Sequence, residues 1–155
     1  MVARDSAAAR SAERELVITR VFDAPPRLVF KAWTEPARLV QWWGPQGFTV
    51  PACAMDVRPG GAFRFRMRGP DGADHWLQGV YQEIVEPERL VCTWTWVDAD
   101  GKPGHETLLT VHFAEQGGKT RLTLHQAIFE SVSARDGHQD GWTSSLDRLG
   151  AYLHP

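Results

Sequence analysis

The last part of the chain carries an apolar stripe at helical spacing. Trp142, Leu146, Leu149 and Leu153 follow one another at steps of four, three and four, so they share one face of an α-helix. A helix with one apolar face needs an apolar partner, and the only large one in this chain is a β-sheet. The pattern therefore predicts a long C-terminal helix that packs on a sheet.

The preceding residues alternate between apolar and polar positions in short runs separated by Gly/Pro turns, which is typical of antiparallel strands. The predicted strands are 15–22, 48–57, 63–68, 75–85, 89–97, 106–114 and 119–127. Two short helices are expected between the first two strands, at 26–34 and from 35 to about 43, and Ser131 or Ser133 is expected to cap the terminal helix. This order predicts an α+β domain in which a curved antiparallel sheet of about six to seven strands wraps around the terminal helix.

The alternation also predicts which residues face inward. We pair Phe63 with Tyr81, Tyr81 with Trp94, and Leu109 with Leu124, and these pairings agree on one inner face. A helix gripped by such a sheet often leaves a cavity, so the inner face is the first place to look for a ligand.

Gly79 is the residue that points to space on this face. It lies in mid-strand, where glycine weakens a sheet, and the pairing places it between Phe65 and Trp96. Either the large rings close over the glycine or a guest molecule fills the gap, with Tyr81 and His138 as its polar anchors. The predicted ligand-binding residues are Phe63, Phe65, Met67, Leu77, Gly79, Tyr81, Trp94, Trp96, Leu109, Val111, His138, Trp142 and Leu146.

Composition limits the range of functions. The 155 residues suit one domain, which we place at 14–155 after a disordered leader at 1–13. A net charge of −2 argues against a nucleic-acid partner, and no apolar run is long enough for membrane insertion. Cys53 and Cys92 stand in strand-like runs without a secretion signal, which favours a reducing, cytoplasmic location.

Catalytic chemistry has only weak candidates. Glu83 faces inward in the simple register and would suit a general base, although a bulge before Glu86 that turns it toward solvent is the favoured interpretation. His75 would project inward at the rim of the sheet. The sequence contains no cofactor fingerprint and no metal-ligand spacing, so we predict no cofactor and no metal site.

Several stretches resemble one family, the domain named for the activator of the ninety-kilodalton heat-shock chaperone's ATPase, in its bacterial branch. The matching stretches are 21–34, 41–45, 58–65, 79–84, 87–91, 141–142 and 146–149. This domain is part of the START-like helix-grip superfamily, so the resemblance implies the helix-grip fold and a deep apolar cavity that holds lipids, sterols or aromatic molecules. Eukaryotic co-chaperones of the family carry a further N-terminal chaperone-binding domain, for which this chain has no room.

Three functions follow as hypotheses. The leading one is a cytoplasmic domain that encloses a small apolar or aromatic ligand. The second is a cyclase- or hydrolase-type enzyme that uses the same cavity. The third is a co-chaperone-like interaction module or a homodimer, with an exposed apolar patch around Trp42, Trp43 and Phe48. Trp42 and Trp43 themselves are interpreted mainly as core residues that end the helix, with at least one of the two indoles near the surface.

Overall fold

Seven antiparallel strands form one sheet in the order β1-β7-β6-β5-β4-β3-β2 in a computed structural model that describes residues 12–154. The strands are β1 (Leu16–Phe22), β2 (Thr49–Met55), β3 (Ala62–Arg68), β4 (Asp74–Val85), β5 (Arg89–Val97), β6 (Thr107–Gln116) and β7 (Lys119–Ala127). The helices are α2 (Pro26–Thr34), α3 (Pro36–Leu39) and α4 (Val132–Leu153). The predicted α+β helix-grip architecture is confirmed.

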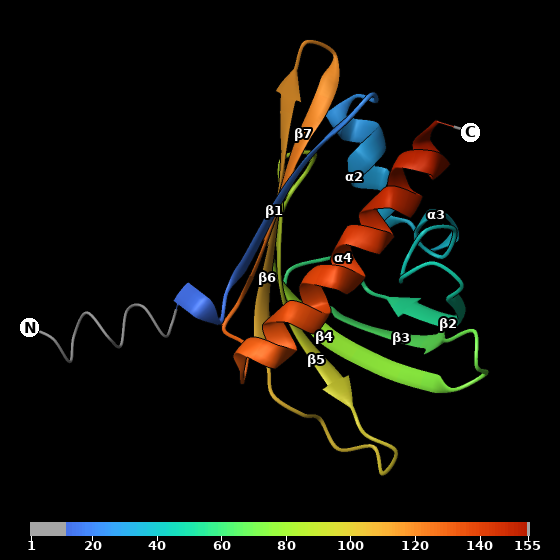
Figure 1. Cartoon of the computed structure of the whole chain (residues 1–155). Coiled ribbons are helices and arrows are strands. Elements are labelled where there is room, and N and C mark those ends of the chain that lie inside the picture. The colour runs from blue at the N-terminus through green and yellow to red at the C-terminus, as the bar shows by residue number, and fades with distance from the viewer. Residues whose placement is uncertain (1–11, 155) are drawn as a thin grey trace, which may run out of the picture.

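The sheet bends around α4, which crosses it diagonally, and α2 and α3 lie beside the C-terminal half of α4 (Figure 1). Trp142, Leu146 and Leu149 are buried against the sheet, while Leu153 is half-buried at the end of the stripe. The Ser131 hydroxyl caps α4 by accepting a hydrogen bond of 3.0 Å from the Ala134 N–H. The apolar stripe therefore determines which face of α4 packs on the sheet, and the Ser131 cap determines where the helix begins.

The strand registers differ from the predicted ones by two residues. Phe63 lies opposite Gly79 rather than Tyr81, and Trp96 lies opposite Leu77 rather than Gly79. The pairing of β6 with β7 is displaced by the same amount. Because side chains alternate with a period of two, a shift of two residues leaves each one on its predicted face, and the inner face is as expected.

The interpretation of Gly79 as a gap for a ligand is wrong. The ring of Phe63, directly opposite on β3, covers the glycine, and an added Cβ would overlap both this ring and the Thr93 carbonyl oxygen. Gly79 is needed because Phe63 and the backbone of β5 approach it closely.

Two further expectations need correction. Trp42 and Trp43 are both buried, with 0% and 5% of their surface exposed, because they pack on Trp33 in the core; no exposed indole patch forms there. In the predicted leader, residues 12 and 13 belong to a helical turn closed by a hydrogen bond from the Glu15 N–H to the Ala12 carbonyl oxygen. The rest of that leader, 1–11, lies outside the described residues.

Within residues 12–154, no helix combines the length and the apolar character that a membrane crossing requires.

Candidate functional site

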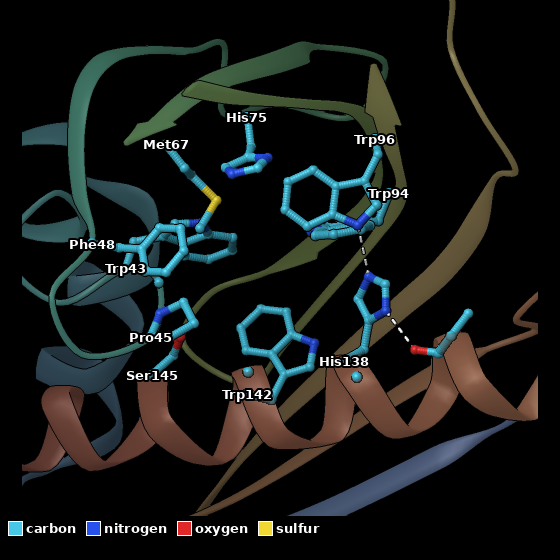
Figure 2. A pocket seen from close by; sticks show the side chains of 14 residues that line it. Trp43, Pro45, Phe48, Met67, His75, Trp94, Trp96, His138, Trp142 and Ser145 are labelled. Carbon is cyan, nitrogen blue, oxygen red and sulfur yellow. Dashed lines mark hydrogen bonds between the residues drawn. The ribbon is translucent and has the colours of Figure 1, made fainter. Parts of the chain in front are cut away.

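A cavity of about 380 Å³ opens between the sheet, the segment after α3 and the N-terminal half of α4 (Figure 2). The sheet contributes Met67, His75, Trp94 and Trp96. The segment after α3 contributes Trp43, Gly44, Pro45 and Phe48. The helix contributes Ala134, Gly137, His138, Gly141, Trp142 and Ser145. This volume lies at the lower end of the range for small-molecule sites.

Four indoles from three parts of the chain line the cavity. Trp94 and Trp96 of β5 meet edge to face with their centroids 4.7 Å apart, and Trp43 and Trp142 meet in the same way at 5.2 Å. Such pairs resist displacement because each ring edge rests on a neighbouring face. The cavity therefore has aromatic walls whose rings contact one another in pairs.

His138 connects α4 to the rim of the sheet. Its Nε2 accepts a hydrogen bond of 3.0 Å from Nε1 of Trp96, and its Nδ1 lies 2.8 Å from the Ala134 carbonyl oxygen (Figure 2). An indole N–H can only donate, so Nε2 carries no proton and Nδ1 donates to Ala134. Burial lowers the pKa of His138, which favours the same neutral form.

A chain of buried hydrogen bonds holds Trp142 in its orientation. Its Nε1 donates to Oε1 of Gln126 at 2.8 Å, and Nε2 of Gln126 donates to the Thr107 hydroxyl at 2.8 Å. Thr107 in turn donates to the carbonyl oxygen of Trp94 at 3.0 Å. Gln126 is fully buried, so this chain links the helix wall of the cavity to its sheet wall without contact with water.

The segment after α3 is attached to α4 by polar contacts. Nη1 of Arg148 lies 2.9–3.1 Å from the carbonyl oxygens of Trp43, Gly44 and Pro45. Gly44 has a φ of +93°, a backbone conformation that glycine adopts without strain and that lets the chain turn here. Arg148 thus holds the third wall of the cavity in place.

Two glycines keep the helix wall open. Gly137 and Gly141 stand one turn apart on α4, and both line the cavity. A Cβ added to Gly137 would meet nothing within 4 Å, and one added to Gly141 would meet only Cγ of Pro45 at 3.8 Å. Because glycine weakens a helix interior, the pair reduces helix stability while leaving space beside the four indoles.

A second, inner void of about 20 Å³ lies deeper between the sheet and Trp33. Tyr81 lines it, and burial raises the pKa of its hydroxyl. No acceptor among residues 12–154 pairs with Nε1 of Trp33 or of Trp94, both of which line the void. Its volume suffices for about one water molecule and not for an organic ligand.

The predicted ligand-binding residues separate into three groups. Those that line the open cavity are Met67, Trp94, Trp96, His138 and Trp142. Those that line the inner void are Phe63, Phe65, Tyr81, Trp94, Leu109 and Val111. Leu77, Gly79 and Leu146 line neither. Of the two expected anchors, His138 faces the open cavity and Tyr81 does not.

The sequence reasoning missed the wall formed by Trp43, Pro45 and Phe48, and the two helix glycines. Their best signal was the spacing of Gly137 and Gly141, four residues apart in the predicted helix. No comparable pattern connected the segment after α3 with the cavity, because that contact joins residues about one hundred positions apart in the chain.

The weak catalytic candidates do not meet. A register shift between Tyr81 and Glu83 turns Glu83 outward, as the favoured interpretation expected, and Glu83 forms an ion pair with Arg89 away from the cavity. An inward-facing Glu83 general base is therefore wrong. His75 lines the cavity, with its ring centroid 6.3 Å from that of Trp96. Cys53 and Cys92 are free thiols whose pKa values are raised by burial, to about 11 and about 12, so neither is an activated nucleophile.

Comparison with known proteins assigns the class of this domain. Residues 23–154 match the family described as Activator of Hsp90 ATPase homolog 1-like protein. The chain therefore belongs to that family. No curated protein matches it.

Solved structures show the same fold in bacterial proteins. The AHSA1 protein of Silicibacter pomeroyi is 31% identical, with a TM-score of 0.81 over 90% of this chain and 96% of its own. Protein CV1439 of Chromobacterium violaceum is 28% identical, with a TM-score of 0.81 over 92% of this chain and 98% of its own. CalU16 of Micromonospora echinospora, at 23% identity and a TM-score of 0.68 over 91% of this chain and 76% of its own, shares the fold.

Proposed function

We propose that the chain binds one small, mainly apolar aromatic molecule in the cavity between the sheet and α4. The observation that supports this proposal is a cavity of about 380 Å³ whose lining, among residues 12–154, includes four indoles and no Lys, Arg, Asp or Glu. Ligand sites of proteins are typically concave and apolar with a few polar groups, and this cavity has that character.

The walls suit a flat ring system. Trp96 of the sheet and Trp142 of α4 both line the cavity, and the missing side chains of Gly137 and Gly141 leave space on the helix wall. Burying ~200 Å² of aromatic surface would supply about 5 kcal/mol before the entropic costs of binding. Affinity in the micromolar range then also needs the rigid walls that Arg148 and Gln126 maintain, since these lower the cost of ordering the site.

Native mass spectrometry of the protein as purified, beside a denatured sample, tests the proposal. We expect an extra mass that is lost on denaturation in the wild type. In Gly141→Leu, the new side chain has to extend into the cavity because its Cβ already lies beside Pro45, so the occupant should be lost. Gly150→Ala, on the same helix but outside the cavity, is the matched control and should keep it.

An occupant that Gly141→Leu retains would contradict the proposal. If the purified wild type carries no extra mass, equilibrium dialysis against methyl naphthyl ketone replaces the first measurement. Absence of binding at about 1 mM ketone, the level that corresponds to the weakest specific affinities, would then contradict the proposal.

The cytoplasmic location, the homodimer and the chaperone partner stay predictions. The ligand proposal is argued from the cavity of a single chain and uses none of them.

A further inference from the structure

The polar groups of the cavity differ from those of an anion site. Among residues 12–154, its lining contains no Lys, Arg, Asp or Glu side chain. The titratable residues that line it are His75 of β4 and His138 of α4. The nearby guanidinium of Arg148 donates from Nη1 to the backbone carbonyl oxygens of Trp43, Gly44 and Pro45.

His138 is held in its neutral form by two partners at once. Trp96 donates to Nε2, and Nδ1 donates to the Ala134 carbonyl oxygen. Adding a proton to Nε2 would set two N–H groups against each other at 3.0 Å, so protonation requires that the contact with Trp96 breaks. The rings of Trp94 and Phe129, with centroids 4.9 Å and 4.8 Å from that of His138, shield it from water.

We infer that the cavity accepts uncharged aromatic molecules and rejects carboxylates at neutral pH, and that protonation of His138 relaxes this rejection. The inference rests on the proposed function and adds the charge of the ligand to it. A carboxylate that entered would lose its hydration and find no cation in exchange, which makes its transfer from water unfavourable. An uncharged ring system carries no such cost.

Acidification should change the site in two ways. The imidazolium form of His138 no longer accepts the Trp96 N–H, and its own Nε2–H becomes a charge-assisted donor for a carboxylate. Glu130, just before α4, bears on this titration because its negative charge favours protonation of His138. His75 of β4 is the other imidazole that lines the cavity. Trp94, Trp96 and Phe129 complete the surroundings and carry no charge.

The experiment compares methyl naphthyl ketone with naphthoate, which match in ring system and differ in charge. Equilibrium dialysis of the full chain measures both affinities at about pH 8 and about pH 5, where histidine changes its charge and naphthoate stays ionised. The variants are His138→Gln, whose amide can still accept from Trp96 and cannot become charged, and His112→Gln, an exposed residue of β6 outside the cavity, as the matched control.

At pH 8 we expect the wild type to bind the ketone at least tenfold more tightly than naphthoate, a factor that corresponds to about 1.4 kcal/mol. At pH 5 this ratio should fall several-fold in the wild type and in His112→Gln, and it should stay constant in His138→Gln. Equal or tighter binding of naphthoate at pH 8 would overturn the inference. So would an equal change of the ratio in His138→Gln, because His138 would then not be the responsible group.

Failure of the inference is distinguishable from failure of the proposed function. If neither probe binds the wild type at pH 8, the function itself fails. If both bind and Gly141→Leu weakens both, the cavity is the site, and the charge preference alone is judged by the ratio.

Discussion

Replacing a cavity-lining glycine of α4 by alanine should stabilise the protein. Gly137 and Gly141 lie inside a regular helix, where alanine is favoured over glycine by about 1 kcal/mol. This gain is normally reduced by clashes, and here they are absent: the added methyl group meets nothing within 4 Å at Gly137 and only Cγ of Pro45 at 3.8 Å at Gly141. We therefore expect each substitution to raise the free energy of unfolding by about 1 kcal/mol.

Urea unfolding followed by circular dichroism measures this change at 25 °C, and thermal unfolding gives an independent value. For a chain of this length, about 1 kcal/mol corresponds to an increase in Tm of about 2–4 °C. Gly150→Ala is the control. It lies on the same helix outside the cavity, and its added methyl group would make ordinary contacts of 3.7 and 3.9 Å with Phe22. It should gain a similar amount.

The informative result is the comparison between positions. If Gly150→Ala stabilises the protein while Gly137→Ala and Gly141→Ala destabilise it, space beside these glycines is not free, and the helix wall of the cavity is wrong. If all three stabilise it, the space is real. In that case the two glycines make the protein less stable than alanine would, at positions where the missing side chains leave space for a ligand.

Three other substitutions test separate parts of the structure. Gly79→Ala should destabilise the protein by about 1–3 kcal/mol in urea unfolding, because its Cβ would overlap Phe63; a neutral result would contradict the observed register. Gln126→Leu should cost about 1–3 kcal/mol because it leaves the buried N–H of Trp142 without an acceptor, and combining it with Trp142→Phe should cost less than the sum of the two. His138→Gln tests the pH dependence. Burial lowers the folded-state pKa of His138 below its ordinary value of 6.5, so the unfolded chain binds the proton first and the contribution to stability is lost as pH falls from about 6.5 to the folded-state pKa. The difference in free energy of unfolding between the wild type and His138→Gln should therefore shrink on acidification. A difference that stays constant between about pH 8 and pH 5 would refute this prediction.

Local pattern was sufficient for the elements and for the faces that they bury. The steps between Trp142, Leu146 and Leu149 predicted the buried stripe of α4, and the alternation around Phe63 predicted the inner face of β3. These features depend only on the periods of the helix and the strand, which are properties of neighbouring residues. The bounds of β5 and β7 were predicted to the residue, helped by the turn-forming residues that stand on both sides of β5 and before β7.

Tertiary structure decided the registers, and with them the place of the cavity. A shift of two residues keeps every side chain on its face, so the alternation alone cannot choose between Tyr81 and Gly79 as the partner of Phe63. The observed register places the Phe63 ring over Gly79 and closes the space expected there. The cavity lies instead where Trp43, held by Arg148, meets the glycine face of α4, and contacts between such distant residues leave no periodic trace in the sequence.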